Sequence, residues 1–188
     1  MQITHTLYLT HRSEWREWLT ENHATAKEIW LVSYPKASPT PCLEYLHAVE
    51  EALCFGWIDG IKKKLDETCT VQRFTPRLPK GNWTELNKER ARRLIARGQM
   101  TEAGRAKLPD LSLDTFSIAN DILEALQKDA QTWQNFESFS QIYQRIRIGY
   151  IEQAREQPEV FNKRLTYFLN KTRQNNKFGV LLSDEDLN

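Results

Sequence analysis

Strand-forming patterns occur only in the first part of this 188-residue chain, which restricts the folds it can adopt. Stretches with alternating or strand-favouring side chains lie at 3–9, 27–34, 62–65 and 69–75. After Phe116 the periodic segments have helical spacing, at 121–127, 131–137, 140–154 and 158–175. The sequence therefore predicts an α+β fold, with a small antiparallel or mixed sheet and packed helices, followed by an all-helical C-terminal module.

Helices and turns are also predicted within the first part. Helical periods cover 13–22, 43–55 and 84–97, with Gly56 and Gly98 placed to end the last two, and one or two helical turns are expected at 100–107. Asp59-Gly60 is a favoured hairpin-turn pair, and a second turn around 66–68 joins two strands. Residues 108–117 are typical of a connection, so we expect domains at 1–107 and 118–176, with a polar tail at 183–186.

The net charge of +1 conceals an uneven distribution. Residues 61–107 carry 13 Lys and Arg against 5 Asp and Glu, a balance of +8, while the flanking segments carry −4 and −3. Such a block attracts phosphates or acidic ligands, or forms a solvated face that pairs with the acidic flanks. The 40% hydrophobic and 27% charged content excludes the disordered class.

Several functional classes lack their signatures. No apolar run approaches the roughly 18 residues of a membrane span, and the start of the chain lacks a signal-peptide pattern, so we expect a cytoplasmic protein. The four histidines and three cysteines lack metal-ligand spacing, and no phosphate-binding loop, dinucleotide fingerprint or nucleophile elbow is present. The sequence predicts neither a metal nor a cofactor.

One part of the chain concentrates residues suited to binding. Arg73, Thr75 and Arg77 alternate along an extended segment, so their side chains could share a face and present two guanidiniums to a carboxylate or phosphate. Tryptophans could wall such a pocket, and Asp59 could orient a cation. The candidate ligand-binding residues are Trp57, Asp59, Lys62, Arg73, Thr75, Arg77, Trp83 and Asn87.

Each candidate also has a purely structural interpretation. The tryptophans could be core residues, Asn87 could belong to a helix cap, and Arg73 and Arg77 could pair with Glu50 or Glu51. Three functions stay open at this point: a binding protein for a small anionic ligand or a partner's acidic group, a nucleic-acid-binding module that uses the basic 61–107 block, and a metal-independent enzyme that uses Asp59 as acid or base. The sequence predicts no oligomeric state.

The same residues carry a family resemblance. The runs EEALCFGWIDGIKKKLD, RFTPR and NWTELNKERARRLIARGQMTEAG, followed by WQNFESFS and YIEQAREQPEVFNKRL, resemble the YdeI/OmpD-associated, or bacteriocin-protection, family of bacterial proteins. The resemblance implies a helical closing module and a link to resistance against bacteriocins and cationic antimicrobial peptides, without an established reaction. It places the family motifs on Trp57, Asp59, Gly60, Lys62, Arg73, Thr75, Arg77, Trp83 and Asn87.

Overall fold

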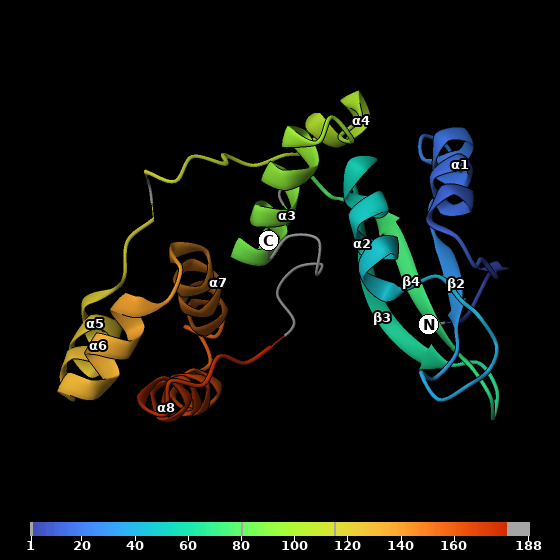
Figure 1. Ribbon diagram of the computed structural model, residues 1–188. Coiled ribbons are helices and arrows are strands. Elements are labelled where there is room, and N and C mark those ends of the chain that lie inside the picture. Colours follow the sequence, from blue (N-terminus) through green and yellow to red (C-terminus); the bar gives the residue numbers. More distant parts are fainter. Residues whose placement is uncertain (1, 80, 115, 180–188) are drawn as a thin grey trace. The chain divides into compact units, whose positions relative to one another are not determined.

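Four strands form a mixed sheet in the order β1-β2-β4-β3 in a computed structural model, which describes residues 2–79, 81–114 and 116–179 (Figure 1). The strands are β1 (Thr6–Leu7), β2 (Ile29–Ser33), β3 (Trp57–Lys64) and β4 (Thr70–Pro76). β1 pairs with β2 in parallel, and the other pairs are antiparallel. The predicted small mixed sheet is confirmed, and β3 lies at one edge of it.

The hairpin between β3 and β4 corrects one expectation. The predicted turn at 66–68 is present, where the Asp66 carboxylate accepts backbone hydrogen bonds from Thr68 (2.6 Å) and Cys69 (3.0 Å). Asp59-Gly60, however, lies inside β3 rather than in a hairpin turn. The register shifts between Asp59 and Lys62, so the glycine marks a β-bulge, which is a common role for glycine within a strand.

Two helices pack on one face of the sheet. These are α1 (Arg12–Asn22) and α2 (Tyr45–Cys54), which lie beside the strands in Figure 1. The ring of Trp15 on α1 lies 5.5 Å from that of Phe74 on β4, and the Trp18 ring lies 5.8 Å from that of Trp57 on β3. Phe74 and Trp57 therefore face the helices, and the core of this part forms between α1, α2 and the sheet.

Two further helices precede the connection: α3 (Glu85–Ala96) and α4 (Glu102–Arg105). The Thr84 hydroxyl accepts the backbone N–H of Asn87 at 3.0 Å, which confirms Thr84 as the N-cap of α3. Thr101 caps α4 in the same way, through the N–H of Gly104 at 3.2 Å.

After the connection, the regular elements among the described residues are helices, as predicted. They are α5 (Asn120–Gln127), α6 (Ala130–Ser138), α7 (Gln141–Glu152) and α8 (Pro158–Arg173). Ser140 caps α7, and Pro158 occupies the first turn of α8, where its missing N–H costs nothing. Their shared core contains the large buried side chains Phe136, Phe161 and Phe168.

Contacts divide the chain into two compact units. The sheet unit comprises Met1–Gly81 and Arg90–Pro109, and the helical unit comprises Asn82–Glu89 and Asp110–Asn188. Residues 82–89, which the sequence groups with the first domain, thus join the helical unit. The tail at 183–186 lies outside the described residues. No helix in the described ranges is long and apolar enough to cross a membrane.

Candidate functional site

The register of β3 and β4 places the predicted site residues of the sheet unit on two faces. Trp57 pairs with Pro76 and Asp59 with Phe74, so both share the face that carries the helices. Lys62 pairs with Gln72 and returns to that face after the bulge. Arg73 and Thr75 alternate with Phe74 and therefore lie on the opposite face. The structure thus separates Arg73 from Asp59.

Arg73 is held by a carboxylate that the sequence did not single out. Its Nε donates to Glu28 at 2.7 Å, and a second guanidinium nitrogen lies 2.5 Å from the same oxygen. Glu28 also accepts from Thr4 (2.5 Å) and from the indole N–H of Trp30 (3.2 Å). Arg73 consequently serves the packing of this sheet face, and the predicted convergence of Arg73 and Arg77 on one anion is not supported.

Acid is expected to weaken this contact. The hydrogen bonds from Thr4 and Arg73 lower the pKa of Glu28 from its usual 4.5 to about 2. Between these values the unfolded chain binds the proton and the native chain does not, so the contribution is complete above pH 4.5 and is lost as the pH falls toward 2. Urea midpoints should therefore show that Glu28→Gln destabilises the protein clearly at pH 7 and much less at pH 3, whereas Glu21→Gln, on the exposed side of α1, changes neither. An equal cost of Glu28→Gln at both pH values would contradict this.

Arg77 lies with Asp59 instead. It follows the last residue of β4, is 3% exposed, and its backbone N–H donates to the Gly56 carbonyl at 2.8 Å. Burial lowers the pKa of Arg77 to about 10, against the opposing effect of the Asp59 carboxylate. Tyr45 donates its hydroxyl to Asp59 at 2.6 Å, and buried Arg90 also interacts with the Asp59 charge. Half-buried Asp59 thus lies on the helix-bearing face among exposed Tyr45 and the buried arginines Arg77 and Arg90.

The remaining predicted residues have structural surroundings. Trp57 is fully buried, and its indole N–H donates to the His23 carbonyl at 3.2 Å, which supports the interpretation as core. Asn87 takes part in the cap of α3 through its backbone. Trp83 lines an open, polar cavity of about 400 Å³ in the helical unit, together with Asn82, Glu85, Gly149, Glu152, Gln153, Arg155 and Glu156.

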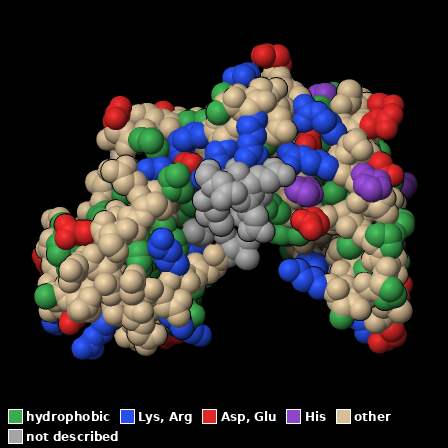
Figure 2. Space-filling model, viewed as in Figure 1, with side chains coloured by type: hydrophobic (Ala, Val, Ile, Leu, Met, Phe, Trp, Pro, Cys, Tyr) green, Lys and Arg blue, Asp and Glu red, His purple; other side chains and the backbone are tan. Residues whose placement is uncertain are grey.

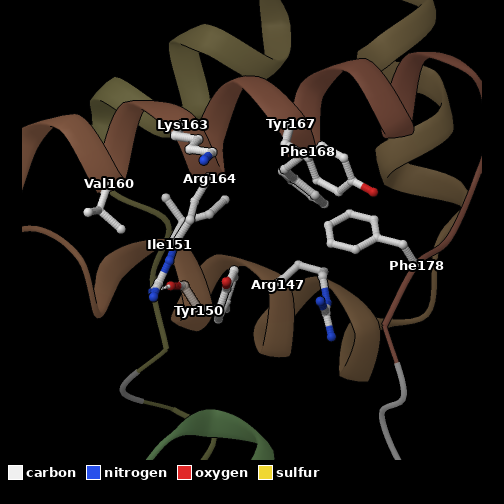
Figure 3. A pocket seen from close by; sticks show the side chains of 9 residues that line it. All are labelled: Arg147, Tyr150, Ile151, Val160, Lys163, Arg164, Tyr167, Phe168 and Phe178. Atoms are coloured by element: carbon white, nitrogen blue, oxygen red, sulfur yellow. Dashed lines mark hydrogen bonds between the residues drawn. The ribbon is translucent and has the colours of Figure 1, made fainter.

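A second cavity, of about 380 Å³, lies between α7 and α8 (Figure 3). Three cationic, four aromatic and two aliphatic side chains line it: Arg147, Lys163, Arg164, Tyr150, Tyr167, Phe168, Phe178, Ile151 and Val160. Among the residues that the structure describes, no carboxylate belongs to this lining. Basic and hydrophobic side chains also lie next to each other on the visible face of the helical unit (Figure 2). The volume of the α7–α8 cavity is within the range of small-molecule sites. Asp59 lines neither this cavity nor the one beside Trp83.

Arg147 has the most unusual environment in this cavity. It is 8% exposed, and its guanidinium carbon lies 4.9 Å from the ring centroid of Phe178, 5.6 Å from that of Tyr143 and 6.0 Å from that of Tyr150. Its Nε is buried without a hydrogen bond, and no ion pair joins it to a carboxylate of the described residues. Burial accordingly lowers its pKa. Aromatic faces of described residues contact this guanidinium and compensate part of its charge.

The other two cations of the α7–α8 cavity, Lys163 and Arg164, lie on α8. Arg164 lies 3.9 Å above the ring centroid of Tyr150 and donates to the Tyr150 carbonyl at 2.6 Å. Figure 3 shows Arg164 reaching from α8 toward Tyr150, and Arg147 on α7 beside Phe178. Lys163 is exposed on α8. Three positive charges thus surround an apolar cavity.

Sequence reasoning missed this cavity, although a signal was present. Val160, Arg164 and Tyr167 follow the spacing i, i+4 and i+7, beside the apolar stripe that identifies α8 as a helix. Arg147 and Tyr150 are likewise three residues apart on α7. A basic and aromatic stripe next to a core stripe indicates a binding surface only when two such stripes face each other, and that requires the packing of α7 on α8.

The described residues contain no group of three or more His, Cys, Asp or Glu side chains placed to hold a metal ion. The cysteines form no disulfide, and burial raises the pKa of Cys54 to about 12, which keeps it protonated and unreactive. The α7–α8 cavity itself offers cationic, aromatic and aliphatic side chains.

Two family models match consecutive parts of the chain. Residues 7–107 match a domain of unknown function (DUF8412), and residues 115–175 match the family described as bacteriocin-protection, YdeI or OmpD-associated. The second range contains every lining residue of the α7–α8 cavity except Phe178. No curated protein and no solved structure matches the chain.

Proposed function

We propose that this chain is a binding protein for a small organic anion. It belongs to the DUF8412 family, whose model matches residues 7–107, and its residues 115–175 form a domain of the bacteriocin-protection, YdeI or OmpD-associated type. The proposed site is the α7–α8 cavity. The observation that carries the proposal is the buried guanidinium of Arg147, which has no carboxylate partner among the described residues and lines a cavity with two further cations.

The energetic argument concerns the cost of this charge. Placing an ion in apolar surroundings is unfavourable unless an opposite charge or hydrogen bonds compensate it. The rings around Arg147 supply part of that compensation, and cation–π contacts are each worth about 0.5–2 kcal/mol. A ligand carboxylate, sulfonate or phosphate would supply the rest, because charge-assisted hydrogen bonds in a low dielectric are strong.

The sign of the charge also constrains how such binding relates to bacteriocin protection. A cavity whose described lining holds three cations and no carboxylate disfavours a cationic peptide. Protection, where this chain contributes to it, would therefore act through an anionic ligand rather than through direct capture of a cationic peptide in this cavity.

Matched pairs of acid and amide test the proposal. We expect 2-naphthoate and octanoate to raise the melting temperature of the protein and to give heat on calorimetric titration, whereas 2-naphthamide and octanamide bind far more weakly. Arg147→Gln should weaken binding of both acids by tenfold to a hundredfold, because losing one charge-assisted contact costs about 1.5–3 kcal/mol. The amides should be unaffected.

Controls separate this result from general charge effects and from the other functions. Arg173→Gln, on the exposed end of α8 outside the cavity, should leave acid binding unchanged. A cationic amphipathic peptide should show no binding that depends on Arg147. A single-stranded oligonucleotide that binds equally well to the Arg147→Gln variant, with no binding of either acid, would overturn the proposal in favour of a nucleic-acid module that uses the basic 61–107 block.

A further inference from the structure

Aromatic rings form most of the apolar wall of the α7–α8 cavity. Tyr150 and Tyr167 are 43% and 49% exposed, so each ring presents surface to solvent. The Tyr167 ring packs at 83° against Phe178, with centroids 4.9 Å apart, so the edge of one ring meets the face of the other. Aromatic groups favour offset-stacked and edge-to-face neighbours, and exposed ring faces are ready partners for another ring.

Tyr150 is also the ring that links the two guanidiniums. Arg164 lies 3.9 Å and Arg147 lies 6.0 Å from its centroid. Arg164 is fixed there by its hydrogen bond to the Tyr150 carbonyl, and no ion pair to a described residue competes for it. An anionic group beside Tyr150 could therefore contact Arg147, with Arg164 adding positive charge on the same ring, while the rest of the ligand contacts the rings.

Resting on the proposed function, we infer that the ligand of this cavity is an aromatic acid: a planar ring system that carries a carboxylate or a similar anionic group. The anionic group contacts Arg147, and the ring system packs against Tyr150, Tyr167 and Phe178. The cavity volume of about 380 Å³ suits one or two fused rings rather than a macromolecular segment. Aliphatic acids of equal size satisfy the charge but not the ring contacts.

Calorimetric titration of the full chain with 2-naphthoate and decanoate, two acids of similar size, tests this inference. We expect 2-naphthoate to bind about three- to tenfold more tightly, which is the range of aromatic pair energies beyond area burial. Tyr150→Leu should reduce that preference, because it keeps an apolar side chain and removes one of the three rings. Tyr150→Phe should retain the preference, and the two variants serve as matched controls for folding.

The outcomes distinguish the two proposals. If decanoate binds as tightly as 2-naphthoate, and Arg147→Gln weakens both, the anion-binding function holds and the aromatic specificity is wrong. If neither acid binds with any dependence on Arg147, the proposed function itself fails. If Tyr150→Leu leaves the preference for 2-naphthoate intact, the ring contacts do not determine it, and the inference is overturned.

Discussion

Glu51→Ala is expected to destabilise the protein by about 3 kcal/mol, near the lower end of the cost of breaking a buried ion pair. Glu51 lies on α2 at 2% exposure and binds two arginines of α1. Its carboxylate accepts from Arg12 Nε, and its second oxygen lies 2.7 Å from Arg16. The variant would leave both cations beside a partly buried interface without this carboxylate.

The raised pKa values of Arg12 and Arg16 support the expectation that Glu51 stabilises the protein. Burial alone would lower the pKa of Arg12, but its contacts with Glu51 and Glu50 outweigh burial, so the pKa is raised. We expect the lower end of the range because the Arg12 and Arg16 side chains are 26% and 37% exposed and can turn toward water. At about 2–4 °C per kcal/mol, the melting temperature should fall by roughly 6–12 °C.

A surface pair provides the control. Glu67 lies 2.8 Å from Lys64 in the β3–β4 hairpin and is almost fully exposed. Glu67→Ala should cost less than about 1 kcal/mol, because water screens such pairs. Equal effects of the Glu51 and Glu67 substitutions in thermal unfolding would show that the buried network does not stabilise the α1–α2 interface.

The fold was largely predictable because local patterns determine it. The strand periods, the hairpin at Asp66, the Thr84 cap and Pro158 at the start of α8 act within a few residues of the chain. The hairpin turn predicted at Asp59-Gly60 was wrong because the same dipeptide suits both a hairpin turn and a β-bulge. Which of the two forms depends on the pairing of β3 with β4, and that pairing is not local.

The candidate site was less predictable, since it depends on which charges meet. The alternation of side chains along β4 correctly predicted a common face for Arg73 and Thr75. It could not reveal that Arg73 forms an ion pair with Glu28, which is 45 residues away in the sequence. Spacing alone allows Glu50 and Glu51 to pair with Arg73 or Arg77, whereas the packing of α1 on α2 pairs both carboxylates with Arg12 of α1. Long-range pairings of this kind follow from tertiary packing.

The cavity between α7 and α8 illustrates the same limit. Each helix is recognisable by its period, and each carries basic and aromatic residues at helical spacing. The charge balance of the sequence instead pointed to residues 61–107, because the segment 108–188 is acidic overall. A local group of cations within an acidic segment becomes visible only when the packing of α7 on α8 brings Arg147, Lys163 and Arg164 to one cavity.

Gly104→Ala is expected to have the other large effect, a loss of about 3 kcal/mol, at the upper end of typical overpacking costs. A Cβ at Gly104 on α4 would lie 2.2 Å from the Cys54 carbonyl oxygen and 2.5 Å from Met100 Sδ. The carbonyl is backbone at the end of α2 and cannot turn aside. Thr101 donates to the same oxygen from its hydroxyl at 2.6 Å and from its N–H at 3.1 Å, so displacing α4 would also break these contacts.

The sign of this change makes it diagnostic, because alanine in place of a helical glycine ordinarily stabilises by about 1 kcal/mol. Gly60→Ala is the matched control, since a Cβ there would meet its nearest neighbour, the Arg73 carbonyl oxygen, at 3.8 Å, an ordinary contact. Thermal unfolding should show a fall of several degrees for Gly104→Ala and little change for Gly60→Ala. A gain in stability for Gly104→Ala would mean that α4 does not pack this closely on the end of α2. The close approach at Cys54 would then contribute nothing to holding residues 100–107 on the sheet unit.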